Sequence, residues 1–316
     1  MPQTAILFTG QGAQSVGMGK DIADRWPVAA QTFAQANEVL GYDLRKLCFE
    51  GPADQLERTD IQQPAIYTSS VAIWRAFNEG RDLPENPVAM AGLSLGEYTA
   101  LHAAGCMTFE AGLQLVRRRG ELMQAAATAV ASGMVSIMGL APDAVETLCQ
   151  TVLAELPPEV VLVPANYNCP GQIVVSGSRE ACERILPLVE QAGGRAIPLK
   201  VAGAFHSPIM QPAADGLATV LADTPLETPQ VPVVANVNCR NHTDAGTIRQ
   251  WLTDQLTHPV RWQASMERLL GEGVEQFIEI GPGRVLAGLM KKISRKTPVV
   301  NLSTAESLEQ YASASR

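Results

Sequence analysis

The chain lacks the features that mark membrane and nucleic-acid-binding proteins. No stretch approaches about 18 unbroken apolar residues, so we expect no membrane-spanning helix. The N-terminal MPQTAILFTGQG has no basic segment followed by a long apolar run, so we expect no signal peptide. Acidic residues outnumber basic ones, 32 to 24, and a net charge of −8 does not attract nucleic acid or anionic lipid. We therefore expect a cytoplasmic protein without a membrane or nucleic-acid partner.

Cysteine and histidine are also scarce, with six and four residues. The cysteines form no C-x-x-C pair and no other metal-ligand spacing, so we expect buried thiols in a reducing compartment and no metal site. Apolar residues nevertheless make up 46% of the 316 residues, enough for a substantial core in one large domain or two smaller ones. Because the chain has no heptad repeat and no long apolar stripe, we expect a monomer.

Strands and helices alternate at both ends of the chain. Short apolar runs typical of buried strands are TAILFT (4–9), PVAMAG (87–92), VPVVANV (231–237) and EQFIEIG (275–281). Helical patterns between and beside them cover 28–40, 64–78, 97–104, 248–256 and 262–271. This alternation predicts an α/β fold with a largely parallel sheet.

The middle of the chain has a different order of elements. Residues 133–201 read as a strand, a helix, two strands joined by an Asn/Pro/Gly turn, a second helix and a final strand. The order β-α-β-β-α-β is that of a ferredoxin-like subdomain. We therefore predict a small ferredoxin-like domain at 130–201, inserted into a larger α/β domain made of 1–129 and 202–316. The last dozen residues, 305–316, are expected to form a surface tail.

Ser94 lies in Gly92-Leu93-Ser94-Leu95-Gly96, between a predicted strand and the helix that follows. A G-x-S-x-G sequence in that context is typical of a nucleophile elbow. The sharp turn exposes the hydroxyl, the glycines allow close approach of neighbouring backbone, and free N–H groups at the helix start can stabilise an oxyanion. The pentapeptide also fits a small-residue turn without catalytic role, because Gly and Ser are common in turns.

A serine nucleophile needs a base, and the four histidines differ in their surroundings. His102 falls within the helix after Ser94, His242 in the polar loop CRNHTDAG, and His258 before a proline at a helix end. His206, in GAFHSPIM, follows the last strand of the predicted small domain, where α/β proteins place catalytic loop residues. Its position in the chain, and the less suitable surroundings of the other three histidines, favour His206 as the base. The alternative is that His206 has only a structural role.

Three consecutive arginines lie in the helical segment FEAGLQLVRRRGELMQAAA (109–127). At about 100° per residue, Arg117 and Arg118 fall on the polar face and Arg119 falls within the apolar face. A buried guanidinium cannot shed its charge and needs an anion, yet no acidic residue lies three or four positions away on that face. The anion is either a distant Asp or Glu or the carboxylate of a substrate. Together with Ser94, the second reading indicates an acyl group that carries its own carboxylate.

The sequence resembles the malonyl-CoA:acyl carrier protein transacylases, including the acyltransferase domains of fatty acid and polyketide synthases. The blocks that carry the resemblance, in the order and spacing of the family, are FTGQGAQSVGMG, GPADQLERTDIQQPAIYTSS, GLSLGEYTAL, RRRGELMQ, NYNCPGQIVVSG, AFHSPIMQPAAD, HPVRW and EIGPGRVL. They span nearly the whole chain. The resemblance implies a hydrolase-like α/β domain with an inserted ferredoxin-like subdomain. It implies no cofactor, since malonyl-CoA is a substrate.

The resemblance also implies roles for individual residues. Ser94 matches the nucleophile, His206 matches the base, and Arg119 matches the clamp for the malonyl carboxylate. Gln255, in DQLTHPVRW, matches the residue whose main-chain carbonyl orients the histidine in place of an acidic group.

Further residues are implied to shape the acyl site. The backbone N–H groups of Gln11 and Leu95 match the oxyanion hole. Asn166 matches a residue near the acyl pocket, although an Asn before a turn usually caps the local backbone. Phe205 matches the malonyl-preferring version of the family, in which it crowds the space that an α-methyl group would occupy. Discrimination between acyl groups that differ by one methyl group is worth about 1–3 kcal/mol. The chain departs from the family at Leu93, where a histidine is usual, so the elbow is less polar.

The implied activity is a ping-pong transfer of malonyl from malonyl-CoA, through a Ser94 acyl-enzyme, to the phosphopantetheine thiol of an acyl carrier protein. A thioesterase or other hydrolase would share Ser94 and His206 but release the acyl group to water. A non-catalytic subunit that retains the fold is a further alternative. A trans-acting acyltransferase of a polyketide line is another, because the sequence does not distinguish fatty acid from polyketide synthesis.

A docking surface for the carrier protein is a separate question. The resemblance implies an acidic carrier, and this chain is acidic too, so docking needs a local positive patch. The segment LMKKISRK supplies four cations over about one and a half helical turns: Lys291, Lys292, Arg295 and Lys296. A solvated helix end stabilised by its dipole accounts equally well for these charges.

Overall fold

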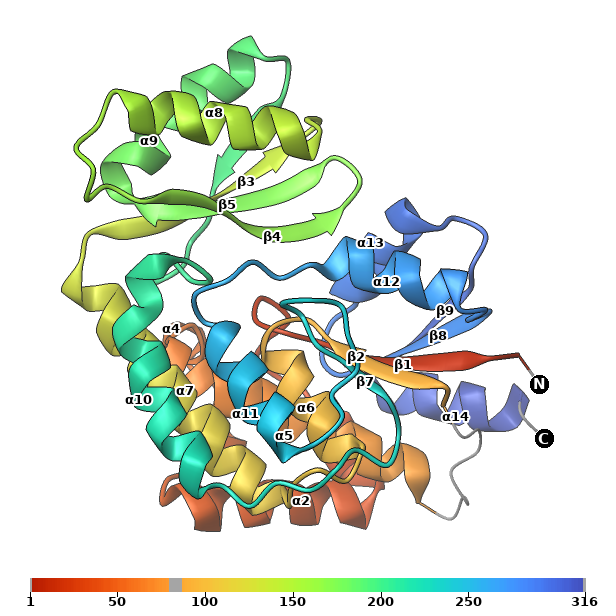
Figure 1. The fold of residues 1–316 in the computed structure, drawn as a ribbon. Coiled ribbons are helices and arrows are strands. Elements are labelled where there is room, and N and C mark those ends of the chain that lie inside the picture. The colour runs from red at the N-terminus through yellow and green to blue at the C-terminus, as the bar shows by residue number, and fades with distance from the viewer. Residues whose placement is uncertain (1, 80–86, 315–316) are drawn as a thin grey trace.

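The computed structural model describes residues 2–79 and 87–314 and contains two β-sheets (Figure 1). The larger sheet has the strand order β7-β2-β1-β8-β9, and its neighbouring strands are parallel. Its strands are β1 (Thr4–Phe8), β2 (Ala89–Gly92), β7 (Val233–Val234), β8 (Gln276–Ile280) and β9 (Val299–Leu302). The predicted α/β fold with a parallel sheet is confirmed.

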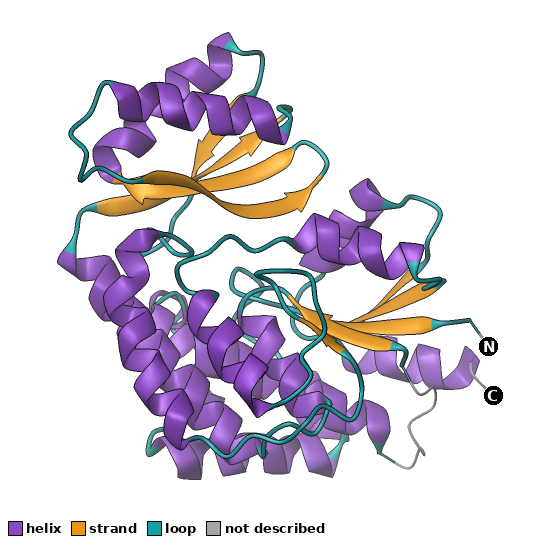
Figure 2. Cartoon of the chain, in the orientation of Figure 1, coloured by secondary structure: helices purple, strands orange, loops and turns teal. Residues whose placement is uncertain are grey.

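Helices cover both faces of this sheet (Figure 2). The alternation of side chains along β1 explains why: Ile6 and Phe8 belong to the apolar core on one face, and Ala5 and Leu7 to a second core on the other. The first core is covered by α1 (Lys20–Arg25), α2 (Pro27–Leu40), α3 (Leu44–Glu50), α4 (Ala53–Leu56), α5 (Thr59–Asn78), α6 (Leu95–Ala103), α7 (Phe109–Ala129), α10 (Gln211–Asp223), which follows a 3₁₀ turn at Pro208–Met210, and α11 (Ala245–Asp254). The second is covered by α12 (Trp262–Gly271) and α13 (Val285–Ile293).

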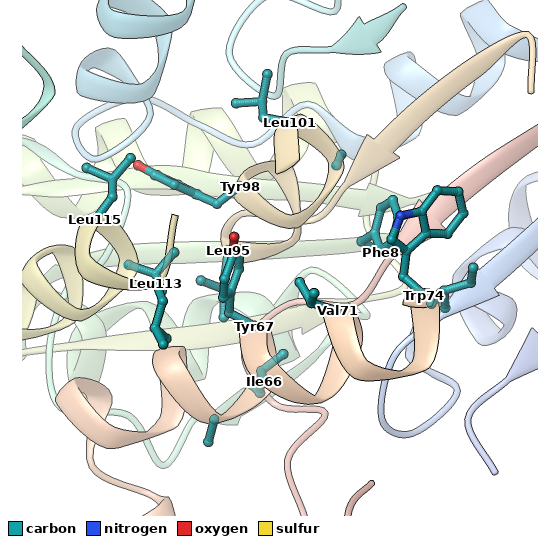
Figure 3. Packing of buried hydrophobic residues seen from close by; sticks show 14 of the residues in the cluster. Phe8, Ile66, Tyr67, Val71, Trp74, Leu95, Tyr98, Leu101, Leu113 and Leu115 are labelled. Carbon is teal, nitrogen blue, oxygen red and sulfur yellow. The ribbon is translucent and has the colours of Figure 1, made fainter. Parts of the chain in front are cut away.

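Helix α5 lies at the centre of the first core and is buried along nearly its whole length. Figure 3 shows Tyr67, Val71 and Trp74 of this helix directed at Leu95 of α6 and Phe8 of β1. The ring of Phe8 meets Trp74 edge to face at 5.8 Å. This packing holds the start of α6 against β1 and β2, which fixes the position of the residues between β2 and α6.

The smaller sheet is antiparallel, with the order β4-β5-β3-β6. Its elements follow in the chain as β3 (Ser132–Met138), α8 (Pro142–Ala154), β4 (Leu162–Cys169), β5 (Gln172–Ser178), α9 (Arg179–Gln191) and β6 (Arg195–Pro198). Both helices pack on one face over a core of their own, and Figure 1 shows the opposite face turned toward the large sheet. Order and pairing are those of a ferredoxin-like fold, as the sequence predicts. The predicted boundaries at 129/130 and 201/202 fall just after α7 and just after β6.

The C-terminal segment differs from the sequence-based expectation. Residues Ala305–Ala314 form helix α14, and the predicted surface tail is wrong for them; residues 315–316 lie outside the described ranges. Leu308 is buried against the large domain. The carboxylate of Asp21 accepts a hydrogen bond from the N–H of Ala305 at 2.6 Å, and Arg25 pairs with Glu309. A single buried leucine in a short polar helix is too weak a pattern to be recognised in the sequence.

In the part of the chain that the structure describes, no helix combines the length and the apolar character needed to cross a membrane.

Candidate active site

The turn between β2 and α6 presents Ser94 at the carboxyl end of the parallel sheet. Ser94 has φ 52° and ψ −103°, a conformation that a residue with a side chain rarely adopts. Glycines on both sides permit it, because a Cβ at Gly92 would collide with the backbone of Gly96, and one at Gly96 with the backbone of Phe8. The elbow therefore needs both glycines of the G-x-S-x-G sequence for steric reasons.

A Gly96→Ala substitution tests this steric argument. Because the added methyl group meets main-chain atoms of β1, which cannot rotate away, we expect a loss of about 1–3 kcal/mol in the free energy of unfolding. Gly288→Ala is the matched control, since a Cβ there has open space around it within α13 and should be neutral or slightly stabilising. Urea unfolding measures both, and equal stability of the two variants would contradict the argument.

His206 lies next to Ser94 and is held in one tautomer. Its Nε2 is 2.9 Å from Ser94 Oγ, and its Nδ1 is 2.7 Å from the main-chain oxygen of Gln255. A carbonyl oxygen only accepts, so Nδ1 carries the proton and Nε2 presents a lone pair to the serine hydroxyl. The contact with Gln255 occupies the position that a carboxylate holds in a Ser-His-Asp triad. The pair is thus arranged for removal of the proton from Ser94.

The pKa of His206 is lowered to about 4, chiefly because burial disfavours the imidazolium, and also because the positive charge of Arg119 is near. The Gln255 carbonyl acts in the opposite direction. A base with this pKa is neutral, and therefore active, at every pH well above 4.

The rate of acylation should follow this lowered pKa. We expect kcat/KM for acyl loading to stay level as the pH falls through 6.5 and to reach half its plateau near pH 4, because protonation of His206 removes the base. A pH–rate profile of the loading step over the range in which the protein stays folded measures this. An acid limb centred near 6.5, the ordinary value of histidine, would contradict the assignment.

Arg119 lies fully buried on α7, directly behind the serine. Its terminal nitrogens donate to Ser94 Oγ at 3.0 Å, to Gln255 Oε1 at 2.9 Å and to Gln63 Oε1 at 2.7 Å. Its Cζ lies 5.1 Å from the centre of the Tyr98 ring. These three hydrogen bonds use three of the five N–H donors of a guanidinium, and Nε is buried without a partner among the described residues.

No carboxylate of the described residues forms an ion pair with Arg119. Burial lowers the pKa of Arg119, while Tyr98 and Glu97 oppose the shift, and a guanidinium remains charged in any case. Its neighbours Arg117 and Arg118 differ, because both pair with Glu121 at the surface of the helix. Arg119 is therefore a buried cation beside the serine with unused donors and no anion in contact.

A pocket of about 200 Å³ opens in front of Ser94 and His206. Gln11 and Leu93 line it, as do Asn166 on β4 and Phe205, so the structure brings these predicted residues together with the dyad. Leu95 is the first residue of α6, and the N–H of a first helical residue has no acceptor within the helix. The wall is otherwise mostly apolar and comes from both domains: Met134, Val174, Leu199, Val201, Val285 and Leu289.

The other histidines stand apart from the serine. His102 contacts the carbonyl of Met107, and His258 is exposed. His242 is buried rather than part of an exposed polar loop, and its Nε2 lies 2.8 Å from Glu97.

Five cysteines are buried as expected, whereas Cys239 is half-buried.

Sequence reasoning missed four residues of this site. Gln63 bonds to Arg119, and Asn236 accepts a hydrogen bond from the N–H of Ser94 at 2.6 Å. Glu97 and His242 form a buried pair beneath them. Glu97 alone could have been noticed, because it is an acidic residue in the first turn of a mostly apolar helix, directly after the elbow. Among the described residues, no group of three or more His, Cys, Asp or Glu is arranged to hold a metal ion.

Comparison with known proteins places this arrangement among acyltransferases. A family described as "Acyl transferase domain" matches residues 6–313. A "Malonyl CoA-acyl carrier protein transacylase" of Salmonella typhimurium is 43% identical over 316 residues, covering 100% of this chain and 98% of that protein. One of the same description from Bacillus subtilis is 41% identical over 310 residues, covering 98% and 96%.

Solved structures agree with these relatives. An acyl carrier protein S-malonyltransferase of Vibrio cholerae superposes with a TM-score of 0.92 at 43% identity, covering 98% of this chain and 99% of that one. A malonyl-transacylase solved in complex with a type II PKS acyl-carrier protein superposes with a TM-score of 0.94 at 42% identity, covering 99% of each chain.

Proposed function

Because this chain belongs to the malonyl-CoA:acyl carrier protein transacylase family of acyltransferases, we propose that it transfers a malonyl group from malonyl-CoA to the phosphopantetheine thiol of an acyl carrier protein. The observation that carries the proposal is the guanidinium of Arg119, buried without an anion and 3.0 Å from Ser94 Oγ. A buried cation there calls for an acyl group that ends in a carboxylate.

In the first half-reaction, Ser94 Oγ attacks the thioester carbonyl of malonyl-CoA while Nε2 of His206 takes the hydroxyl proton. The guanidinium of Arg119 lies 3.0 Å from this Oγ and so beside the acyl group that forms on it. The N–H groups of Gln11 and Leu95 stabilise the oxyanion, a contribution of about 3–4 kcal/mol per donor in comparable sites. The C–S bond breaks, the proton on His206 passes to the CoA thiolate, and CoA leaves.

In the second half-reaction, the carrier thiol enters the same pocket. His206 takes its proton, the thiolate attacks the Ser94 ester, and the serine leaves with the proton returned by the imidazole. The pocket wall favours a thiol over water, because Leu93, Val285 and Leu289 make the approach to Ser94 apolar. No step of this cycle changes an oxidation state.

The malonyl carboxylate is held by Arg119 throughout both half-reactions. Its two oxygens accept from the guanidinium donors, with Gln63 and Gln255 yielding or sharing their bonds. An acetyl group has no carboxylate and would leave the buried charge unpaired, so it should load poorly. Phe205 and Asn166 also line the pocket, where they limit substituents next to the thioester carbonyl.

Intact-protein mass spectrometry with purified malonyl-CoA tests the function. We expect a malonyl-sized adduct within the dead time of mixing by hand, stable until holo carrier protein is added and then transferred to it. A hydrolase acting through the same Ser94 and His206 would lose the adduct to water at a rate that the carrier protein does not change. That outcome would favour the thioesterase reading over the transferase.

The carrier protein is proposed to dock beside the basic end of α13. Lys291, Lys292, Arg295 and Lys296 are all exposed. The helix ends at Ile293, so the last two follow it instead of extending it as the sequence suggests. Lys292 lies near Cys169 at the end of β4, where its charge opposes the burial that raises the pKa of that thiol. The same strand carries pocket-lining residues, so the patch adjoins the pocket mouth.

Reversing the charges at Lys292 and Arg295 to Glu should raise the KM for carrier protein at least about 5-fold, because two attractions to an acidic partner become repulsions. The kcat/KM for loading from malonyl-CoA should stay near that of the wild type. Lys46→Glu on α3, also exposed, is the matched control at a distant surface. An unchanged KM in the double variant at low ionic strength would remove the docking proposal.

A further inference from the structure

A buried carboxylate lies beneath the elbow and touches neither reacting group. Glu97 is fully buried in the first turn of α6, three residues after Ser94. It accepts three hydrogen bonds, from Nε2 of Gln255 at 2.7 Å, from the N–H of Asn236 at 3.0 Å and from Nε2 of His242 at 2.8 Å. Such a carboxylate is desolvated at a cost that only well-placed donors offset.

The first of these bonds determines which way the Gln255 amide faces. Its Nε2 donates both to Glu97 and to the main-chain oxygen of Ser94, at 2.7 and 3.2 Å, so Oε1 is turned toward Arg119. The reversed amide would set an oxygen against the carboxylate and an NH₂ group against the guanidinium. Both contacts would be repulsive, so Glu97 selects the one orientation in which Gln255 supports Arg119.

The second bond braces the serine. Glu97 holds the main chain of Asn236, whose side chain accepts from the N–H of Ser94 at 2.6 Å and donates to the oxygen of Gly92 at 2.8 Å. The Asn236 side chain is therefore hydrogen-bonded to the main chain of both Gly92 and Ser94, and so stabilises the turn in which Ser94 has a positive φ. One carboxylate therefore fixes the two partners that position the nucleophile and the guanidinium.

We propose that Glu97 is a positioning residue that acts through Gln255 to present Arg119 to the acyl carboxylate, and so sets the preference for carboxylated over neutral acyl groups. The proposal rests on the function proposed above. The Gln255 amide separates the carboxylate from the guanidinium, so Glu97 offsets part of the burial of that cation without occupying its donors. An acid in direct contact with Arg119 would compete with the substrate carboxylate.

Loading rates of a Glu97→Gln variant from malonyl-CoA and from acetyl-CoA test the proposal. We expect the malonyl-to-acetyl ratio of kcat/KM to fall about 10-fold or more, mainly through a higher KM for malonyl-CoA, because Gln255 no longer has a fixed orientation. Glu279→Gln is the matched control: Glu279 is also buried and also accepts three hydrogen bonds, but from Leu286, Ala287 and Asn301. It should lower stability and leave the ratio near that of the wild type.

A double-mutant cycle shows whether Glu97 acts through Gln255. In a Gln255→Ala background, Glu97→Gln should change the ratio by less than about 2-fold, because the group that relays the effect is gone. The proposal would be overturned if the effects of Glu97→Gln and Gln255→Ala on the ratio simply multiplied in the double variant. It would also be overturned if Glu97→Gln alone kept the wild-type ratio.

If Glu97→Gln does not fold, Glu97→Asp serves instead, because its shorter side chain cannot reach Gln255 and Asn236 together. An unaltered malonyl-to-acetyl ratio in Glu97→Asp would overturn the proposal. A wild-type protein that forms no malonyl adduct would instead overturn the function on which the proposal rests.

Discussion

Arg119→Ala is expected to reduce malonyl loading of the protein by about 100- to 5,000-fold, while loading from acetyl-CoA is spared or rises. The physical reason is that the malonyl carboxylate would enter a buried site with no cation to receive it, a loss of about 3–5 kcal/mol for a broken buried ion pair. The measurement is the rate of adduct formation from each thioester, followed by intact-protein mass.

Two variants sharpen this result. Arg118→Ala, one position away on the same helix, removes an exposed cation that pairs with Glu121 and should load both thioesters like the wild type. Arg119→Lys keeps the charge but not the fork of donors, so it should fall between wild type and alanine. If Arg119→Ala lost malonyl and acetyl loading equally, the guanidinium would support the site's structure and would not select the substrate.

Ser94→Ala is expected to abolish the acyl-enzyme and to slow transfer to the carrier protein by at least about 10⁴-fold, because the covalent route needs the Oγ that His206 deprotonates. No malonyl-sized mass shift should appear after prolonged incubation. His206→Ala should retain a slow shift, since the nucleophile remains while its base is gone. A full shift in Ser94→Ala, mapped by peptide mass to another side chain, would contradict the assignment of the nucleophile.

The parts of the site that the sequence predicts are those set by local rules. The elbow at Ser94 depends on glycines within two residues of it, because the colliding backbone atoms are close in the chain or belong to the adjacent strand. Arg119 is recognisable because the helical period alone decides which residues of α7 face inward, and Arg119 is buried as that period predicts. The parallel sheet and the ferredoxin-like unit follow for the same reason, from periodicity and element order.

The parts that the sequence could not predict depend on contacts between distant segments. Asn236 is a single polar residue near the end of the apolar run 231–237, and His242 lies in a polar stretch that looks like a surface loop. Only the parallel pairing of β2 with β7 brings them beneath Ser94. Glu97 is then satisfied by donors from residues more than 130 positions away, for which neither spacing nor periodicity gives a signal. Gln63 is similar, because it lies on α5 and only the packing of α5 against α7 brings it to Arg119.

The most direct test of this account is a crystal structure of the protein trapped as its malonyl adduct. We predict density continuous with Ser94 Oγ, with the distal carboxylate within about 2.7–3.2 Å of the guanidinium nitrogens of Arg119. An adduct on Ser94 whose carboxylate points out through the pocket mouth, while Arg119 keeps its bonds to Gln63 and Gln255, would contradict it.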